Sequence, residues 1–369
     1  MAYTTIDDPS AHFQVETYTG AGANTSVTFS GNSDLKPDFL WLKNRTAGYA
    51  HAAFDSNRNL GSAVNAPFLE PNDTGTENSN QNWWNATNYG INTDGFQFGS
   101  VSEHNLNNLG SEYVAWAWKA NGGTTSSNTD GDITSTVQVN SDAGFSIVTY
   151  TGNGSTADQT VGHGLGVRAN AVLVKNRDSA VNWVVYVDGL TVNHCLELNT
   201  TDGQSDSTQG RVLSSSAGSY GTSSIFTLIN GSGSVIQTNT SGEDYVAYCF
   251  AEKQGYSKFG KYVGNGSTNG TFVYTGFKPA FIMCKRIDGA GNSWDMPDNA
   301  RDPFNPSGRT LYADTLGAEL TGNNVDLLSN GFKQRDTSGN RNGNGLTYIY
   351  MAFAENPFVT STGIPTTAR

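Results

Sequence analysis

Charged residues, and with them some of the main helix formers, are scarce in this sequence. Asp, Glu, Lys and Arg together make up only 15 % of its 369 residues, against about 25 % in an average globular protein. Because Lys and Glu, with Leu and Ala, are the residues that build helices, this shortage argues against a helical protein.

Cysteines and long apolar runs are also few. The three cysteines, Cys195, Cys249 and Cys284, are an odd number without CxxC spacing, which argues against a disulfide framework or a zinc site. No stretch approaches the 18 apolar residues of a transmembrane helix. Residues 1–9 lack the basic and apolar regions of a signal peptide. We therefore expect the chain to fold in a reducing cytoplasm.

Positive charge is in deficit, since the formal net charge is −12. Proteins that bind DNA, RNA or anionic membranes rely on a positive electrostatic field. We therefore expect no nucleic-acid partner and no insertion into a membrane.

Small polar residues and aromatics are abundant instead. The 43 Gly, 39 Asn, 40 Thr and 35 Ser make up about 43 % of the chain. The 16 Tyr, 18 Phe and 7 Trp argue against disorder, because disordered chains lack aromatics. This composition is typical of short strands joined by many small polar turns, in a chain long enough for two or three domains.

Three sequence patterns recur in the same order three times. The first is an aromatic strand that ends in glycine (residues 13–20, 145–152 and 259–264), and the second is an apolar strand that ends in lysine (37–43, 169–175 and 279–285). The third is an alternating strand that begins with tyrosine (113–119, 245–252 and 348–355). In the three copies, the tyrosine of the first pattern precedes the lysine of the second by 25, 25 and 23 residues. That lysine precedes the tyrosine of the third pattern by 70, 70 and 63 residues. The repeated anchor positions are Tyr18, Lys43 and Tyr113, then Tyr150, Lys175 and Tyr245, then Tyr262, Lys285 and Tyr348.

These repeats predict a domain organisation. We expect an N-terminal arm (1–12), a first unit (13–119), a Gly/Ser/Thr-rich linker (120–144), a second unit (145–252), a third unit (253–355) and a C-terminal tail (356–369). Neither the arm nor the tail has a core pattern, so we expect that, if they are ordered, contact with something else orders them.

The third pattern alternates with a period of two, which is typical of a strand. The first copy places Val114, Trp116 and Trp118 on one face and Tyr113, Ala115 and Ala117 on the other. We expect the large face to fill a core and the small face to let another layer approach closely. Two packed antiparallel sheets meet this requirement, so each unit is predicted to be a β-sandwich.

The same alignment assigns roles to the cysteines and lysines. Cys249 and Cys284 stand where the other copies have alanine, leucine or valine, so we expect them to be core residues. Cys195 lies in another alternating run and has the same interpretation. Lys43, Lys175 and Lys285 could share a function. The favoured interpretation is a structural role, in which the side-chain stem packs along the sheet and the charge lies at its rim.

Several long segments resemble those of one family. They are the opening residues 1–11, Tyr-Val-Ala-Trp-Ala-Trp-Lys-Ala-Asn-Gly-Gly at 113–123, Ser-Lys-Phe-Gly-Lys-Tyr-Val-Gly-Asn-Gly at 257–266, and Tyr-Ile-Tyr-Met-Ala-Phe-Ala-Glu-Asn-Pro-Phe at 348–358. Together they are similar to repeat-containing virion structural proteins of marine tailed bacteriophages, and the similarity covers most of the chain. It implies a tail-fibre or surface protein of the virion. It carries over no active site and no position in the particle.

No motif predicts catalysis or a resident cofactor. The five histidines lack metal-binding spacing, and His163 is interpreted as a turn residue that tolerates unusual backbone angles. The loops at Gly152 and Gly264 lack the Lys-Ser/Thr of a phosphate-binding loop, so their Asn-Gly pairs predict hairpins. Oxygen-rich turns at 128–132 and 336–344 leave a calcium site open.

Aromatic side chains in polar surroundings are the best candidates for ligand binding. Trp83, Trp84 and Tyr89 lie in a stretch rich in Asn and Thr, where rings can stack on a sugar while amides bond its hydroxyls. For Trp83 and Trp84, packing in a core or an interface is the favoured interpretation and ligand binding is the alternative. Packing is also the favoured interpretation for Trp183 and Trp294, which follow the lysine strands of the second and third copies.

We therefore expect an all-β chain of tandem antiparallel β-sandwich units, jelly-roll or lectin-like, in three related repeats. The leading functional hypothesis is a non-enzymatic tail-fibre or receptor-binding protein, assembled in the host cytoplasm and placed on the virion surface, which contacts host glycan through many weak contacts. One alternative is a decoration or head-fibre protein attached to capsid or tail through its arms, favoured by the lack of coiled-coil heptads. Another is a polysaccharide depolymerase. Expected partners are other virion proteins, a host surface glycan and further copies in a homo-oligomer such as a trimer, with no cofactor.

Overall fold

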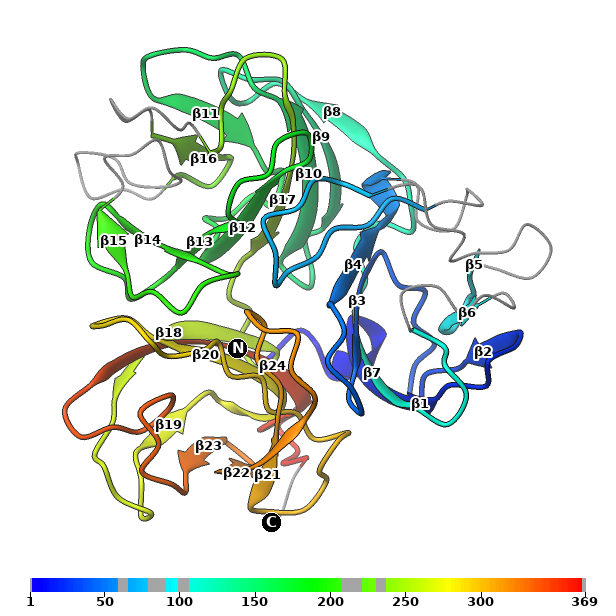
Figure 1. Ribbon diagram of the computed structural model, residues 1–369, viewed down its shortest axis with the longest axis vertical. Coiled ribbons are helices and arrows are strands. Elements are labelled where there is room, and N and C mark those ends of the chain that lie inside the picture. Colours follow the sequence, from blue (N-terminus) through cyan, green and yellow to red (C-terminus); the bar gives the residue numbers. More distant parts are fainter. Residues whose placement is uncertain are drawn as a thin grey trace.

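The computed structural model describes residues 2–58, 66–78, 90–98, 106–206, 221–229 and 237–366. Within them the protein consists of β-strands and two short 3-10 helices, η1 (Pro9–Ala11) and η2 (Ser56–Arg58). Paired strands run antiparallel in every described sheet. The all-β class predicted from the sequence is therefore confirmed. Figure 1 shows three groups of strands around a common centre, which we call unit 1 (13–119), unit 2 (120–252) and unit 3 (253–357).

Unit 1 has a front sheet in the order β1-β7-β3-β4 and a back sheet in the order β2-β6-β5. The front strands are β1 (Phe13–Thr19), β7 (Glu112–Trp118), β3 (Phe39–Asn44) and β4 (Ala52–Asp55). The back strands are β2 (Thr25–Val27), β6 (Phe96–Phe98) and β5 (Gly90–Ile91). A core that includes Tyr18, Leu40, Phe96 and Tyr113 lies between the two sheets.

Unit 2 has an eight-stranded sheet in the order β15-β14-β13-β12-β17-β10-β9-β8 and a two-stranded sheet β11-β16. Its strands are β8 (Ser126–Asn128), β9 (Ser135–Asn140), β10 (Phe145–Thr151), β11 (Gln159–Gly162), β12 (Ala171–Asn176), β13 (Val184–Val187), β14 (His194–Glu197), β15 (Ser205–Asp206), β16 (Ile225–Leu228) and β17 (Asp244–Phe250). The interpretation of residues 120–144 as a linker is wrong, because β8 and β9 extend this sheet beyond β10. β9 carries the β-branched residues Thr136, Val137 and Val139, which are enriched in strands, and β8 forms the edge of the sheet.

Unit 3 has a front sheet in the order β18-β24-β20 and a back sheet in the order β19-β23-β22-β21. The front strands are β18 (Ser257–Val263), β24 (Thr347–Pro357) and β20 (Phe277–Arg286). The back strands are β19 (Phe272–Tyr274), β23 (Gly331–Gln334), β22 (Leu320–Leu328) and β21 (Ser307–Thr310). Tyr262, Ile282, Phe332 and Tyr350 are among the residues that fill the space between them.

A pair of stacked tyrosines marks the same place in each front sheet. The ring centroids are 4.8, 5.0 and 5.1 Å apart in Tyr18–Tyr113, Tyr150–Tyr245 and Tyr262–Tyr348. The first hydroxyl of each pair donates to a backbone carbonyl, that of Leu106, Thr238 or Arg341. The second accepts from a backbone amide, that of Asn108, Thr240 or Gly343. Burial raises the pKa of all six phenols, so they stay neutral in the core.

The opposite faces of β7, β17 and β24 turn toward the centre of the molecule. Trp118, Phe250 and Phe353 meet there with ring centroids 5.5 to 6.2 Å apart. They belong to one hydrophobic core to which all three units contribute. The strand face with the large side chains fills a core, as predicted, but all three units share that core. The face with the small side chains packs on the back sheet of its own unit.

Three seams close the units into a ring. At each seam the segment that follows the lysine strand of one unit packs against the central strand of the next. Arg58 of unit 1 donates to the hydroxyl of Tyr248 on β17, and β13 of unit 2 contacts β24. Unit 3 closes the ring, because Asp298 accepts a hydrogen bond from Trp116 on β7. We call these seams 1/2, 2/3 and 3/1.

Two seams are polar at their centre and one is apolar. Asp55 Oδ2 accepts from Arg58 Nε and from the Tyr248 hydroxyl, both at 2.6 Å, at seam 1/2. At seam 3/1 Asp298 Oδ2 accepts from Arg301 Nε at 2.7 Å and from Trp116 Nε1 at 3.0 Å. The residues in the corresponding places of seam 2/3 are Val187, Leu190 and Met351, all in the shared core. Tyr248 and Trp116 can donate a hydrogen bond, and each therefore faces a buried Asp–Arg pair. Met351 cannot, and it faces aliphatic side chains.

The two terminal segments are held by the chain's own units. The Tyr3 hydroxyl donates to Gly276 O at 2.7 Å, and the Thr4 hydroxyl donates to Gln254 O at 2.7 Å. The amide and hydroxyl of Ser361 both donate to the Asp7 carboxylate, which joins the arm to the tail. Contacts with unit 3 and with each other therefore hold the described parts of the arm and the tail.

The glycine loops after β10 and β18 are not hairpins, so that prediction is wrong. Each loop carries the chain from the front sheet to the back sheet, because β10 pairs with β9 and β17 and the strand after the loop pairs with β16. A Cβ atom at Gly152 would clash with Thr240 O, so only glycine fits this crossing. The loop amides of Asn153 and Gly154 are already bonded to Asn239, which leaves no phosphate cradle.

Candidate functional site

The three repeated lysines lie inside the seams and not at the rim, which corrects their expected position. The three side chains are buried, and burial lowers the pKa of each amine to about 8. Each amine donates to a carbonyl of its own unit, that of Asn44, Asn176 or Asn292. Each also donates across a seam, from Lys43 to Leu316 O (3.1 Å), from Lys175 to Thr74 O (3.1 Å) and from Lys285 to Thr200 O (3.3 Å).

The tryptophans that follow two of these lysine strands also lie in seams. Trp183 Nε1 donates to Glu70 O at 3.0 Å, and Trp294 Nε1 donates to Glu197 O at 2.9 Å. His51 holds the corresponding place in unit 1, with Nε2 3.1 Å from Tyr312 O. All three side chains are buried, so Trp183 and Trp294 are packing residues, which was the favoured interpretation.

The ligand patch proposed from the sequence lies outside the described residues. Trp83, Trp84 and Tyr89 all fall in the segment 79–89, which separates two described parts of the chain. They therefore stay a prediction, and we searched the described surface for a binding site.

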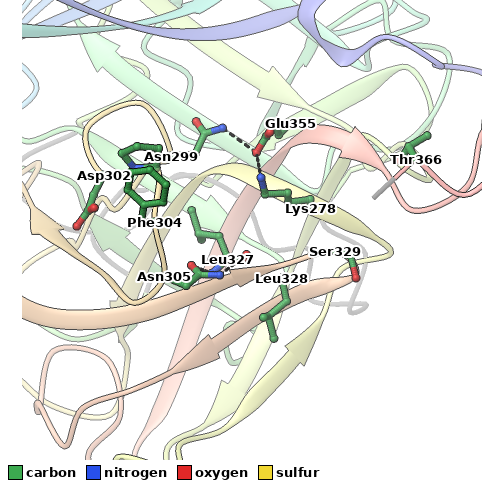
Figure 2. A pocket seen from close by; sticks show the side chains of 11 residues that line it. Lys278, Asn299, Asp302, Phe304, Asn305, Leu327, Leu328, Ser329, Glu355 and Thr366 are labelled. Carbon is green, nitrogen blue, oxygen red and sulfur yellow. Dashed lines mark hydrogen bonds and ion pairs between the residues drawn. The ribbon is translucent and has the colours of Figure 1, made fainter. Parts of the chain in front are cut away.

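A hollow of about 510 Å³ opens in unit 3 beside an exposed aromatic side chain, Phe304. Phe304 is 74 % exposed, against 44 % for Phe272, another exposed phenylalanine of unit 3. Figure 2 shows it on the loop before β21, across the hollow from Lys278 and Glu355. The volume lies in the range of small-ligand sites in proteins.

The loop that carries Phe304 is fixed from inside the protein. Arg301 is buried, its amide donates to Asp298 Oδ1 at 2.9 Å, and its Nε donates to Asp298 Oδ2. On the other side of Phe304, the Asn305 amide donates to Leu327 O and accepts from Leu327 N, both at 2.9 Å. Because both flanks are bonded, the loop that presents the ring to solvent has little backbone freedom to lose on binding.

The far wall of the hollow is a polar cluster. Glu355 Oε2 accepts from Asn299 Nδ2 at 2.9 Å and forms an ion pair with Lys278 Nζ at 2.6 Å. Asp302 lines the same hollow next to Phe304 (Figure 2). An aromatic face and amide, carboxylate and ammonium groups therefore surround one space, and these groups can bond the hydroxyls of a ligand that stacks on the ring.

Sequence reasoning missed these residues. Phe304 stands in Asp302-Pro-Phe-Asn-Pro306, where the two prolines interrupt any strand. An aromatic residue between such breaks is the one signal that could have nominated it. Lys278 and Glu355 come from two strands far apart in the sequence, and only the pairing of β20 with β24 brings them together.

Other candidates from the sequence are occupied by structural bonds. The His163 side chain is buried, and its Nδ1 accepts a hydrogen bond from Leu165 N. The positive φ angle beside it belongs to Gly164, so the interpretation of His163 as a residue with unusual backbone angles is wrong. Asp132 accepts from the amide and hydroxyl of Thr160. All three cysteines are buried, as expected for core residues. Within the described ranges, no group of three or more His, Cys, Asp or Glu is placed to hold a metal ion.

Comparison with known proteins adds a family and no function. None of the helices in the described part of the chain could cross a bilayer. No curated protein gives a significant match. A family model described as Domain of unknown function (DUF7483) matches residues 8–357, which include all three units, and the chain therefore belongs to this family.

Proposed function

We propose that this chain is a non-enzymatic surface protein of a bacteriophage virion, a tail-fibre or receptor-binding protein that binds host glycan through the hollow beside Phe304. The observation that carries the proposal is the exposed phenylalanine, held on a loop bonded on both flanks, above a polar hollow. The resemblance of four long segments to virion proteins supports the place of the protein in a phage particle.

Sugars fit this arrangement because they combine an apolar ring face with hydroxyl groups. The C–H face of a pyranose can stack on Phe304, while Asn299 and Lys278 lie across the hollow as partners for its hydroxyls. Such a site binds weakly as a single copy. Several copies of the chain in one particle would raise the effective affinity through multivalency.

The test compares Phe304→Ala with Phe272→Ala, since Phe272 is another exposed phenylalanine of unit 3 that lies outside the hollow. Purified surface polysaccharide of the host is titrated against each full-length variant. An aromatic stacking contact contributes about 1 kcal/mol, so we expect F304A to bind roughly five- to tenfold more weakly, and F272A to bind as the unaltered chain does. Equal binding by F304A would refute the site. Release of reducing sugar during the titration would support the depolymerase alternative.

A further inference from the structure

The three front sheets differ at one edge. The strand before the crossing loop is β10 in unit 2, and β9 pairs with its outer edge. The corresponding strand of unit 3 is β18, and no strand of the described residues pairs with its outer edge, although the turn at Gly189 contacts it: a Cβ atom there would lie 3.0 Å from Lys261 Cβ. In unit 1 that strand is β1, and no strand of the described residues pairs with its outer edge.

The backbone of β1 offers hydrogen bonds on this outer side. Lys119 N donates to His12 O at one end of the β1–β7 pairing, and Gly20 N donates to Ser111 O at the other. Because the bonds of an antiparallel pair alternate, the even-numbered residues of β1 face β7 and Phe13, Val15 and Thr17 turn their amides and carbonyls outward. The Thr17 amide is covered by Glu16 Oε1 at 3.1 Å, which protects the edge only in part.

A second hollow, of about 350 Å³, lies beside this edge. It is bounded by Phe13–Val15 of β1, by residues 30–32, and by Asn299 and Glu355 of unit 3. In unit 2 the residues of β10 in the same register, Phe145–Ile147, have Gln138–Asn140 of β9 beside them. The hollow in unit 1 therefore lies where unit 2 has a strand.

The walls of this hollow are fixed. The side chain of Gln14 is buried, donates to Ser10 O and Ser33 O, and accepts from Gly31 N at 2.8 Å. A Cβ atom at Gly31 would clash with the Gln14 amide, so residues 30–33 lie tightly against β1. A groove with rigid sides and an open backbone edge is the kind of site that binds an extended peptide by strand addition.

We propose that the outer edge of β1 binds an extended strand from another protein chain, antiparallel to β1, in the place that β9 takes on β10. The strand would resemble residues 135–140, in which β-branched residues alternate with hydroxyl and amide side chains. In unit 2, Gln138 reaches Ser56 and Asn57 of unit 1 across the seam. Asn299 lies in the matching place beside β1 and would bond a central polar residue of the incoming strand. Asn299 and Glu355 also line the hollow beside Phe304, so the two sites adjoin, but the proposal rests on the open edge of β1 and does not require glycan binding.

The probe is a synthetic peptide with the sequence of residues 133–141, added at saturating concentration to the full-length chain. Hydrogen exchange followed by mass spectrometry is expected to slow at least tenfold in the segment 13–19, since the peptide would cover its outward amides. A peptide with proline in place of the central glutamine lacks a ladder donor and is expected to leave exchange unchanged. Absence of protection at β1 by the first peptide, or equal protection by both, would overturn the proposal.

A matched pair of variants locates the bound peptide. Asn32→Arg places a long side chain in the hollow from an exposed position and is expected to weaken peptide binding at least tenfold, while Thr268→Arg, at an exposed loop of unit 3, is expected to leave it unchanged. Equal binding by both variants would overturn the location. If purified host polysaccharide slows exchange in 13–19 and the peptide does not, the groove binds sugar and the strand proposal is wrong.

Discussion

The buried Asp55–Arg58 pair at seam 1/2 can be replaced by the apolar residues that occupy the corresponding places of seam 2/3. Both side chains are fully buried, and Arg58 also donates to Ala53 O and to Glu77. The replacement is the triple variant Asp55→Val, Arg58→Leu and Tyr248→Met, which copies Val187, Leu190 and Met351 of seam 2/3. Glu77 keeps its two bonds to Arg177, at 2.8 and 2.9 Å, so the substitution leaves no carboxylate without a cation.

The free energies of unfolding should depend on whether the pair is broken or replaced. Arg58→Leu alone leaves the Asp55 carboxylate buried without its cation, which costs about 3–5 kcal/mol. Tyr248→Phe removes one hydrogen bond from each member of the pair and costs about 1–3 kcal/mol. The triple variant removes every buried charge of the pair, so its cost should be below that of Arg58→Leu, at most about 2 kcal/mol. Part of that cost is the lost stacking of Tyr248 on Phe39, whose ring centroids are 4.1 Å apart.

Urea-induced unfolding followed by tryptophan fluorescence measures these differences, with equal slopes required before the midpoints are compared. The expected order of stability is unaltered chain, then triple variant, then Arg58→Leu. The reasoning would be refuted if the triple variant lost as much unfolding free energy as its three single substitutions lose together. That result would mean that the stability of the seam depends on the ion pair itself. A cost below 1 kcal/mol for Arg58→Leu would refute it equally.

Two further predictions concern features that recur in the units. The folded pKa of Lys43 is about 8 against 10.5 when unfolded, so the unfolded chain binds more protons between these values and stability should rise with pH across that window. From pH 7 to pH 9 the unfolding free energy of Lys43→Met should rise less than that of the unaltered chain, by about 1 kcal/mol, and equal rises would show that the amine is not desolvated. Gly152→Ala should cost about 1–3 kcal/mol in urea unfolding, because the added methyl group meets Thr240 O. Gly75→Ala, with open space at its Cβ position, should cost little, and a similar loss in both variants would exclude the close approach as the cause.

The sequence was enough for the fold class and for the two faces of the central strands. Alternation in 113–118 separated Trp116 and Trp118 from Ala115 and Ala117, and the structure keeps them on opposite sides. Periodicity states which residues share a face, but not which body covers that face. For that reason the shared centre of three units could not be predicted from the pattern of any one of them.

The sequence also could not predict where a side chain lies when its position depends on backbone contacts with a distant part of the chain. The charge of Lys175 was expected at a rim, with its stem packed along the sheet, yet the carbonyl of Thr74 from another unit accepts a hydrogen bond from its amine inside the seam. Residues 120–144 look like a linker because they are rich in Gly and Ser, whereas the Ile, Thr and Val of residues 133–139 also suit a strand. The hollow beside Phe304 depends on Glu355 and Asn299 from separate strands and loops, and no local pattern connects them.

The closed ring of seams sets the order in which the protein can become stable during synthesis. Trp116 and Trp118 lie early in the chain, but residues of unit 3 cover them, and the last of its strands ends at Pro357. At about 5–20 residues per second, these aromatic faces wait roughly 10–50 s for their partners. A nascent chain therefore carries an exposed aromatic surface for most of its time on the ribosome, and chaperones that bind such surfaces should associate with unit 1 until β24 emerges.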